Sequence, residues 1–211
     1  VFLILGYVLS SSLSFADGHE AAEAAVADPA EISFVFNTLL FCIGGFLVMW
    51  MAAGFTMLEA GLVRGKNTVV ICIKNLGLFS IAGLAYYLIG YNLMYAGVDG
   101  GYIGSISIWS SGVGSADDLV GQAYSPASDW FFQMVFVATT ASIVSGALAE
   151  RILIYPFFAF ILVLTAFLYP ISGSWQWGGG WLSEMGFSDF AGSTIVHSVG
   201  GWAALVGALV L

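Results

Sequence analysis

Five long apolar stretches follow one another along the sequence, and each is long enough to cross a lipid bilayer as a helix. They lie at about residues 34–62, 69–96, 129–149, 152–169 and 189–211. Inside a bilayer only helices and closed barrels satisfy every backbone polar group. Only 8% of the residues are charged, whereas about a quarter are charged in a soluble domain. We therefore predict an all-α, polytopic membrane protein with five transmembrane helices, of which the fourth stops at Pro170.

The sequence ahead of the first apolar stretch has two sections. Residues 1–16 form an apolar run that ends in Ser-Phe-Ala, a pattern typical of a signal-peptide cleavage site. Residues 17–32 are acidic and rich in alanine, and we expect them to form an extracytoplasmic segment. The transmembrane domain would then occupy residues 33–211. Because the run has no initiator Met and no basic residues, we expect residues 1–16 to be the remnant of a signal peptide.

The basic residues indicate which ends of the helices face the cytoplasm. Arg64 and Lys66 lie between the first and second stretches, and Arg151 lies between the third and fourth, whereas the other two connections carry only acids. The positive-inside rule therefore predicts an N-terminus outside the cytoplasm and places Leu211 at the cytoplasmic face of the cell (inner) membrane. A signal peptide requires the same orientation. An odd number of spans is typical of one half of an inverted-repeat transporter.

Two charged residues fall inside or near the ends of apolar stretches. Glu59 precedes Arg64 and Lys66, and we expect an interfacial acid with these two basic partners. Lys74 lies one to two turns inside the second stretch, and we expect its long side chain to snorkel back to the surface.

Composition also excludes several kinds of site. With 4 Lys and Arg against 13 Asp and Glu, the chain has no surface for nucleic acid. The two cysteines, Cys42 and Cys72, both lie within apolar stretches, where neither a disulfide nor a metal site is expected. We expect no metal, no cofactor and no enzyme activity.

A histidine near the start of the last apolar stretch is the most informative ionisable group. His197 follows Asp189 by eight residues, which is about 12 Å along a helix and near the middle of a hydrocarbon core about 30 Å thick. The other histidine, His19, lies in the leader, so we expect His197 to be the only buried one. The same helical face carries small residues: Ser193, Gly200, Gly201, Ala204 and Ala208. Two interpretations remain open, a histidine that only packs and a histidine of a pore or proton relay.

Aromatic residues precede that histidine on the predicted outer side. Phe132 and Phe136 share one face of the third helix, Trp177 lies in an outer loop before three glycines, and Asp189 opens the fifth span. Aromatic faces attract small cations, and two stacked phenyl rings would form a constriction that favours the neutral molecule. The arrangement suits a solute that exists as both cation and neutral form, with His197 below. The alternatives are lipid-facing phenylalanines, an interface tryptophan and an aspartate that only caps a helix.

Four sequence runs carry a family resemblance. They are the runs at residues 56–67 (Thr-Met-Leu-Glu-Ala-Gly-Leu-Val-Arg-Gly-Lys-Asn), 146–151 (Gly-Ala-Leu-Ala-Glu-Arg), 177–180 (Trp-Gly-Gly-Gly) and 189–197 (Asp-Phe-Ala-Gly-Ser-Thr-Ile-Val-His). Together they closely resemble the ammonium transporter family (Amt/Mep/Rh). The resemblance implies an eleven-helix inverted-repeat fold, of which these five helices would be the first half. It also implies a homotrimer with one pore per subunit and a PII-class regulatory protein on the cytoplasmic face.

The resemblance also implies a role for each candidate residue. Phe132 and Phe136 would be outer phenylalanines, with Phe136 in the gate, and Trp177 would line the external ammonium site. Asp189 would support that site, and His197 would be the first of two pore histidines that share a hydrogen bond. The partner histidine, a second gate phenylalanine and a serine of the external site have no match in this sequence. We therefore expect a bacterial fragment cut at both ends.

Three hypotheses for function follow. The first is ammonium uptake, in which the cation is recruited outside and deprotonated, and ammonia passes His197. The second is an ammonium sensor that uses the same membrane fold to signal. The third is a scaffold in which His197 only packs.

Overall fold

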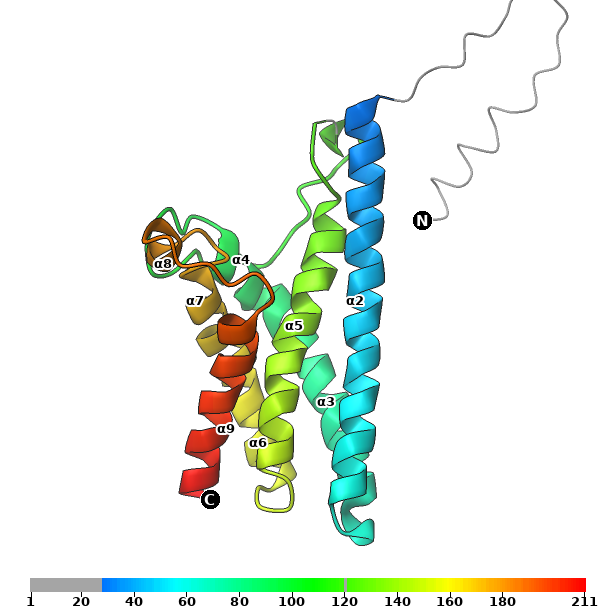
Figure 1. Cartoon of the computed structure of the whole chain (residues 1–211), viewed down its shortest axis with the longest axis vertical. Helices are drawn as coiled ribbons and strands as arrows, with labels where there is room; N and C mark the ends of the chain where they lie inside the picture. Colours follow the sequence, from blue (N-terminus) through cyan, green and yellow to red (C-terminus); the bar gives the residue numbers. More distant parts are fainter. Residues whose placement is uncertain (1–27, 120) are drawn as a thin grey trace, which may run out of the picture.

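The computed structural model describes residues 28–119 and 121–211 as an elongated bundle of helices (Figure 1). The predicted signal-peptide remnant at residues 1–16, and residues 17–27 of the acidic segment, lie outside the described residues. No β-strand occurs within the described ranges, and five helical stretches are long and apolar enough to cross a membrane. They are Pro29–Leu62, Gly65–Tyr95, Pro126–Ala147, Ile154–Ser174 and Ser193–Val210. The predicted all-α class with five transmembrane helices is confirmed.

Several of these stretches combine helices of different winding. The second contains the 3₁₀ turn η1 (Gly65–Asn67), α3 (Thr68–Ala85), the π turn η2 (Tyr86–Gly90) and α4 (Tyr91–Tyr95). The fourth contains α6 (Ile154–Val163), the π turn η4 (Leu164–Leu168) and α7 (Tyr169–Ser174). The fifth contains the π turn η5 (Ser193–Ser198) and α9 (Val199–Val210). The first and third are α2 (Pro29–Leu62) and α5 (Pro126–Ala147), and the outer connections hold η3 (Ala116–Leu119) and α8 (Trp181–Glu184).

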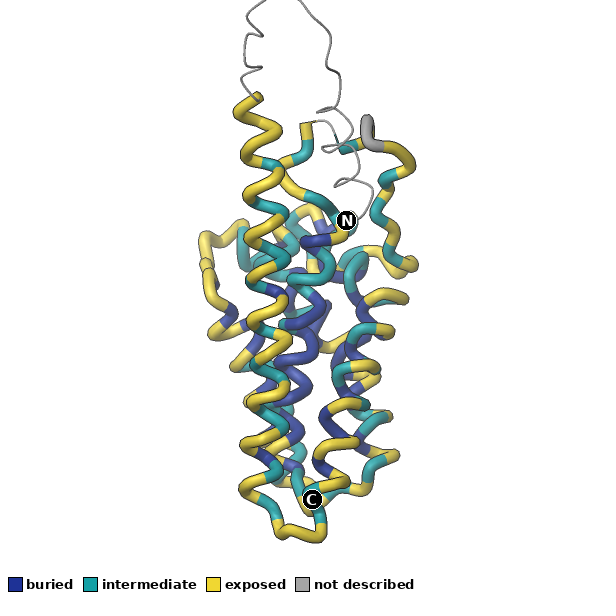
Figure 2. The backbone as a smooth tube through the Cα atoms, turned by 90° about the vertical axis from the view of Figure 1, so that its right-hand side faces the viewer, coloured by how far each residue is buried: buried dark blue, intermediate teal, exposed yellow. Residues whose placement is uncertain are grey.

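Helix α5 lies at the centre of the bundle, where it packs against α2, α3 and α9. Its residues are mostly buried, whereas the outward face of α2 is exposed along its length (Figure 2). Glycines bring α2 and α5 together. A Cβ at Gly44 would lie 2.7 Å from the Phe132 ring, and one at Gly45 would lie 2.4 Å from the Phe131 ring. The two glycines therefore make room for two phenyl rings of α5.

The first helix begins earlier than its apolar pattern predicts, at Pro29 instead of Phe34. The Asp28 side chain accepts a hydrogen bond of 2.9 Å from the Ala30 N–H, and Pro29 occupies the first turn. An acidic N-cap followed by proline favours a helix start at this point.

The prediction that the fourth span stops at Pro170 is wrong, because the helix continues through it to Ser174. The π turn η4 lies directly before Pro170, and the Tyr169 N–H bonds the Leu164 carbonyl. A π turn widens the helix where the proline ring would otherwise collide with the carbonyl four residues earlier. The proline is therefore accommodated inside the helix.

The fifth helix starts later than predicted. Gly192 adopts φ 84° ahead of η5, so the helix begins at Ser193 instead of Asp189. Its first turn lies well below the outer end of α5 (Figure 1). The segment before it therefore runs down into the bundle from the outer loops.

An ion pair is buried between α2, α3 and α5. The Lys74 Nζ lies 3.6 Å from the Glu59 Oε2 and donates to the Ser145 carbonyl at 2.8 Å. The Asn75 amide and the Ser145 hydroxyl donate to the same Glu59 oxygen, at 3.0 and 2.9 Å. The Lys74 Nζ also lies 5.0 Å from the centre of the Phe157 ring. The pair therefore ties three helices together.

This pair corrects two predictions. Lys74 does not snorkel to the surface, and Glu59 is not an interfacial acid, because they are only 4% and 3% exposed. Arg64 instead pairs with Glu150, its Nε 3.2 Å from Oε1. The Asn67 side chain, the Arg64 backbone N–H and the Arg64 guanidinium lower the pKa of Glu150. Glu59 finds a lysine of the next helix because its side of α2 faces α3 and α5.

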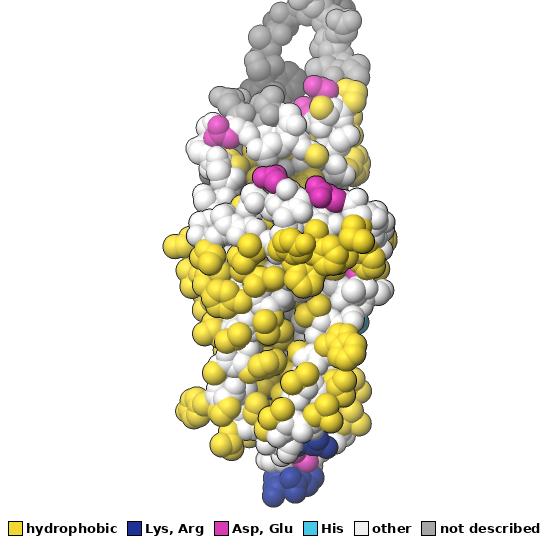
Figure 3. All heavy atoms as spheres, turned by 90° about the vertical axis from the view of Figure 1, so that its left-hand side faces the viewer, with side chains coloured by type: hydrophobic (Ala, Val, Ile, Leu, Met, Phe, Trp, Pro, Cys, Tyr) yellow, Lys and Arg dark blue, Asp and Glu magenta, His cyan; other side chains and the backbone are white. Residues whose placement is uncertain are grey.

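The outer surface matches a bilayer environment. On the face that Figure 3 shows, apolar side chains form a belt, with acids above it and basic side chains below it. The connection between α2 and α3 and that between α5 and α6 lie at the lower end, and α8 lies at the other (Figure 1). The described part of the chain is therefore a multi-pass membrane protein.

Candidate functional site

The two predicted outer phenylalanines, of which Phe136 is predicted to lie in the gate, are one turn apart on α5. The ring centroids of Phe132 and Phe136 are 5.0 Å apart with an interplanar angle of 86°. The Phe41 ring of α2 stacks on Phe132 at 5.1 Å. The prediction of two stacked phenyl rings is therefore wrong in its geometry, because Phe132 and Phe136 meet edge to face while Phe132 stacks on α2. An edge-to-face pair is a favoured arrangement, since the positive ring edge meets the negative face.

Trp177 reaches Phe136 from the loop between α7 and α8. Its ring centroid lies 6.2 Å from that of Phe136, and its Nε1–H donates to the Asp189 carbonyl at 2.6 Å. The following glycine fixes the loop, because a Cβ on Gly178 would lie 2.0 Å from the Met94 carbonyl oxygen. Residues of α5 and of two outer loops thus meet around one tryptophan.

Asp189 caps the fifth helix, as predicted, although from outside its first turn. Its carboxylate accepts hydrogen bonds from the N–H groups of Gly192, Ser193, Thr194 and Ile195, at 2.9, 3.0, 2.8 and 2.8 Å. The side chain is 7% exposed. Burial by itself would raise the pKa of Asp189, but the four N–H groups together hold it below its ordinary value. The charge of this carboxylate is therefore directed at the helix amides.

Phe132, Phe136 and Trp177 line one outer cavity of about 930 Å³. The cavity brings together aromatic rings from α2, α4 and α5 and the segment before η5. The remaining lining residues are Leu40, Phe41, Gly44, Tyr91, Tyr95, Tyr124, Asp129, Gln133, Phe190 and Ala191. Neither Asp189 nor His197 is among the lining residues. The structure thus brings three of the five predicted site residues to one cavity. Asp189 directly precedes two lining residues, Phe190 and Ala191, and His197 lies further along the chain in η5.

Sequence reasoning missed the acid that does line the cavity, Asp129. It lies in the first turn of α5, is 9% exposed, and accepts a hydrogen bond from the Tyr91 hydroxyl of α4. A signal was available, because Asp129, Phe132 and Phe136 follow the spacing of one helix face. An aspartate at the start of an apolar stretch is typical of a residue that marks the end of a span, so the sequence alone did not indicate that Asp129 lines the cavity.

His197 lies near the end of η5, close to the start of the fifth helix, and the prediction that it is buried is wrong for the described chain. The side chain is exposed, and its Nδ1 lies 3.3 Å from the Gly192 carbonyl oxygen. A carbonyl only accepts, so this contact is a hydrogen bond when Nδ1 carries the proton, which leaves Nε2 free as an acceptor. The two neighbouring glycines of α9 differ in their surroundings. Gly200 packs against Ile143 of α5, whereas Gly201 faces open space.

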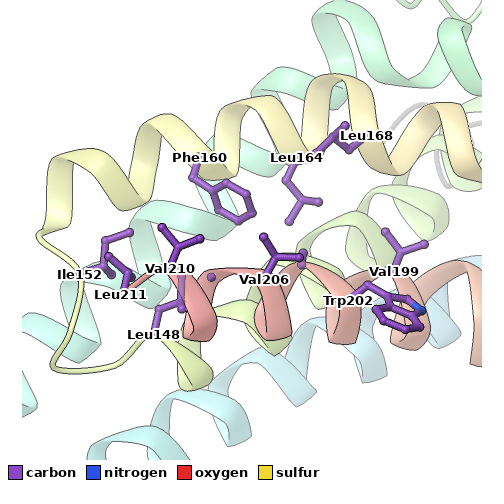
Figure 4. Close-up of a pocket in the computed structure, with 12 residues that line it drawn as sticks. Leu148, Ile152, Phe160, Leu164, Leu168, Val199, Trp202, Val206, Val210 and Leu211 are labelled. Atoms are coloured by element: carbon purple, nitrogen blue, oxygen red, sulfur yellow. The ribbon is translucent and has the colours of Figure 1, made fainter.

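A second hollow, of about 570 Å³, lies between α6 and α9 and has a different character (Figure 4). Its lining is apolar and includes Phe160, Leu164, Trp202 and Val206. No carboxylate or amide side chain lines it. The outer cavity offers a cation a carboxylate as well as aromatic rings, so the outer cavity is the candidate site.

Comparisons with known proteins identify a family for the chain. A profile described as the Ammonium Transporter Family matches residues 39–211. A Synechocystis sp. protein, named as a candidate ammonium transporter, is 44% identical over 100% of this chain and 47% of its own length. The ammonium transporter Amt2 of Archaeoglobus fulgidus is 42% identical over 86% of this chain and 39% of its own length. The chain thus spans about half or less of these relatives.

Solved structures agree with the sequence matches. A protein described as Sensor Amt Protein superposes with a TM-score of 0.75 and 38% identity, over 83% of this chain and 44% of that one. A mutant of Candida albicans Mep2 superposes with a TM-score of 0.72 and 26% identity, over 87% of this chain and 41% of that one. The five-helix bundle therefore matches part of a larger fold.

Proposed function

The chain belongs to the ammonium transporter family, and from that premise we propose that it forms part of a pore that takes up ammonium across the cell membrane. The observation that carries the proposal is the outer cavity lined by Phe132, Phe136 and Trp177. Three aromatic rings at the mouth of a membrane bundle suit a small cation, because each ring face attracts positive charge. The relatives named as ammonium transporters support the choice of substrate.

The proposed route begins in that cavity and continues past the edge-to-face pair of phenyl rings. A bare cation would lose its hydration there at high cost, whereas ammonia is neutral and small. Deprotonation therefore precedes passage. His197 comes next along the route, where a free Nε2 could accept a hydrogen bond from ammonia or a proton. Asp189 contributes by fixing the start of the fifth helix, and its charge adds negative potential on the outer side.

The orientation follows the charges. We place the N-terminus outside the cytoplasm and Arg64 and Arg151 inside, in the inner membrane of the cell, and this placement agrees with the basic patch below the apolar belt (Figure 3). Residues 33–211 would form the transmembrane domain, preceded by the acidic segment at residues 17–32 and the signal remnant at residues 1–16. A homotrimer with a PII-class regulator on the cytoplasmic face remains part of this proposal.

One observation favours a second function, the sensing of ammonium. The superposing structure with 38% identity is described as Sensor Amt Protein. A sensor would hold the cation in the same outer cavity and would signal without net uptake. The two functions separate in a transport assay, because a sensor binds methylammonium but does not accumulate it inside the cell.

The experiment uses the natural protein that contains this sequence, expressed in cells that lack their own ammonium uptake. Uptake of labelled methylammonium is measured for the wild type, His197→Ala and Phe136→Ala. We expect both variants to lose about tenfold or more of the uptake rate, because one removes the proton-accepting group and the other removes an aromatic face of the outer cation cavity.

The matched control is Phe36→Ala, which removes an exposed phenylalanine of the same size from α2, and it should transport as the wild type does. Wild-type selectivity and pH dependence in His197→Ala would contradict the assigned role. Unchanged uptake in a variant that carries both His197→Ala and Phe136→Ala would favour the scaffold hypothesis.

A further inference from the structure

The outer cavity contains a carboxylate whose charge no Lys or Arg residue of the chain neutralises. All four Lys and Arg residues of the sequence are accounted for elsewhere. Lys74 pairs with Glu59 and Arg64 pairs with Glu150, while Lys66 and Arg151 follow α2 and α5 at the opposite end of the bundle from the cavity. Among the described residues, no Lys or Arg serves as the counter-charge of Asp129, which leaves that role open to a proton or to a cation that enters the cavity.

A neutral group holds the Asp129 carboxylate in place without neutralising it. The Tyr91 hydroxyl donates to Oδ2. A neutral donor of this kind stabilises a charged carboxylate. Tyr91 comes from α4 and Asp129 from α5, so a residue of a second helix orients the acid at the cavity wall.

Two further polar atoms beside the cavity lack a partner among the described residues. They are the Gln133 Oε1 and the Tyr95 hydroxyl oxygen, and both are buried. A buried polar atom without a hydrogen bond is unfavourable and calls for an explanation. Both atoms can accept a hydrogen bond, and an ammonium-class cation is a donor on every N–H. The chemistry missing from the cavity is thus a positively charged donor.

We propose that Asp129, oriented by Tyr91, is the charged group of an outer cation-holding site for ammonium and its small alkyl derivatives. The proposal rests on the proposed function and adds a specificity-determining residue to it. Asp129 lies one turn before Phe132 on the same face of α5, and Phe136 follows one turn later. A cation leaving the carboxylate therefore meets the phenyl pair next, without crossing another helix.

Aromatic rings complete the site. Phe41 stacks on Phe132 and meets Tyr124 edge to face, with centroids 5.1 and 4.7 Å apart. These rings line the same cavity as Asp129. A carboxylate with aromatic walls favours a cation that can shed part of its hydration and contact ring faces, as ammonium and methylammonium can. The carboxylate holds the cation ahead of the gate, and the rings select its size.

The test measures the half-saturating concentration and the maximal rate of methylammonium uptake for the natural protein and for Asp129→Asn. Loss of a charged acceptor should raise the half-saturating concentration about tenfold or more, with a change of less than about twofold in the maximal rate. The matched control is Asp99→Asn, which removes an exposed outer acid that does not line the cavity. It should leave both values at the wild-type level.

Several outcomes would overturn the proposal. An Asp129→Asn protein with the wild-type half-saturating concentration shows that Asp129 is neutral or uninvolved, while wild-type uptake in the same cells shows that the proposed function stands. A fall in maximal rate alone assigns Asp129 a structural role. If Asp129→Asn fails to reach the membrane, Tyr91→Phe decides the matter. A rise of about threefold in its half-saturating concentration supports the site, and no rise contradicts it.

Discussion

Two carboxylates lie inside the bundle near opposite ends of α5, and they differ in the charge of their partners. Glu59 has an ammonium group of its own chain 3.6 Å away, in Lys74, and two further donors on the same oxygen. Asp129 accepts a hydrogen bond from a neutral donor, the Tyr91 hydroxyl, pairs with no basic side chain among the described residues, and lines a cavity of about 930 Å³. The comparison indicates that a neutralised acid serves to hold helices together. An acid that the chain leaves unneutralised is available to a ligand.

The largest expected effect comes from breaking the inner pair. Lys74→Met leaves Glu59 buried and unpaired between three helices, and such a loss costs about 3–5 kcal/mol of stability. The unfolding temperature of the purified natural protein measures it. The double variant Glu59→Gln with Lys74→Met should recover most of the loss, because it removes the stranded charge. The outer cavity is untouched in both variants.

The control for the inner pair is an exposed one. Arg64→Met removes the basic partner of Glu150, which stays in contact with solvent, and exposed ion pairs contribute little. If Lys74→Met unfolds at the same temperature as Arg64→Met, the inner pair does not hold the bundle together. The claim that the neutralised carboxylate, Glu59, holds the helices together would then be wrong.

A smaller effect is expected at Asp189, a carboxylate satisfied by backbone amides. Asp189→Asn loses the negative charge at the helix N-terminus and one of the two oxygens that accept from the four N–H groups, a loss of about 1–2 kcal/mol. The pKa of Asp189 is lower in the folded protein than in the unfolded chain, so its stabilisation is present at neutral pH. It is lost as the pH falls below about 4 through the lowered pKa.

Unfolding temperatures at several pH values test this prediction. The difference between the wild type and Asp189→Asn should be largest at neutral pH and should shrink on acidification. A difference that stays constant with pH would show that the carboxylate charge contributes nothing to the cap. In that case the charge of Asp189 would have no role, in contrast to the charges of Glu59 and Asp129.

Much of the fold was predictable, because long apolar stretches in a chain with few charges leave helices as the available solution. Local winding was not predictable. The π turn before Pro170 allows the helix to continue, and nothing in the residue pattern indicates it. The π turn at the start of the fifth span and the left-handed Gly192 likewise moved that helix start away from Asp189.

The candidate site was predictable in part. The spacing of Phe132 and Phe136 placed them on one face, and the family resemblance identified Trp177. Charge partners were harder, because Lys74 and Glu59 meet only once α2 and α3 pack side by side. A basic residue near the end of a span is equally compatible with snorkelling and with a buried pair. Asp129 was missed because its significance depends on Tyr91, a residue of another helix.

The most direct measurement is the unfolding temperature of the purified natural protein in ammonium chloride, compared with sodium chloride at the same ionic strength. A ligand that binds only the folded state stabilises it by RT ln(1 + L/Kd), where L is the free ligand concentration. The wild type and Arg64→Met should both unfold at higher temperature in ammonium, and Asp129→Asn should show no such rise. An ammonium-dependent rise in Asp129→Asn equal to that of the wild type would contradict the account.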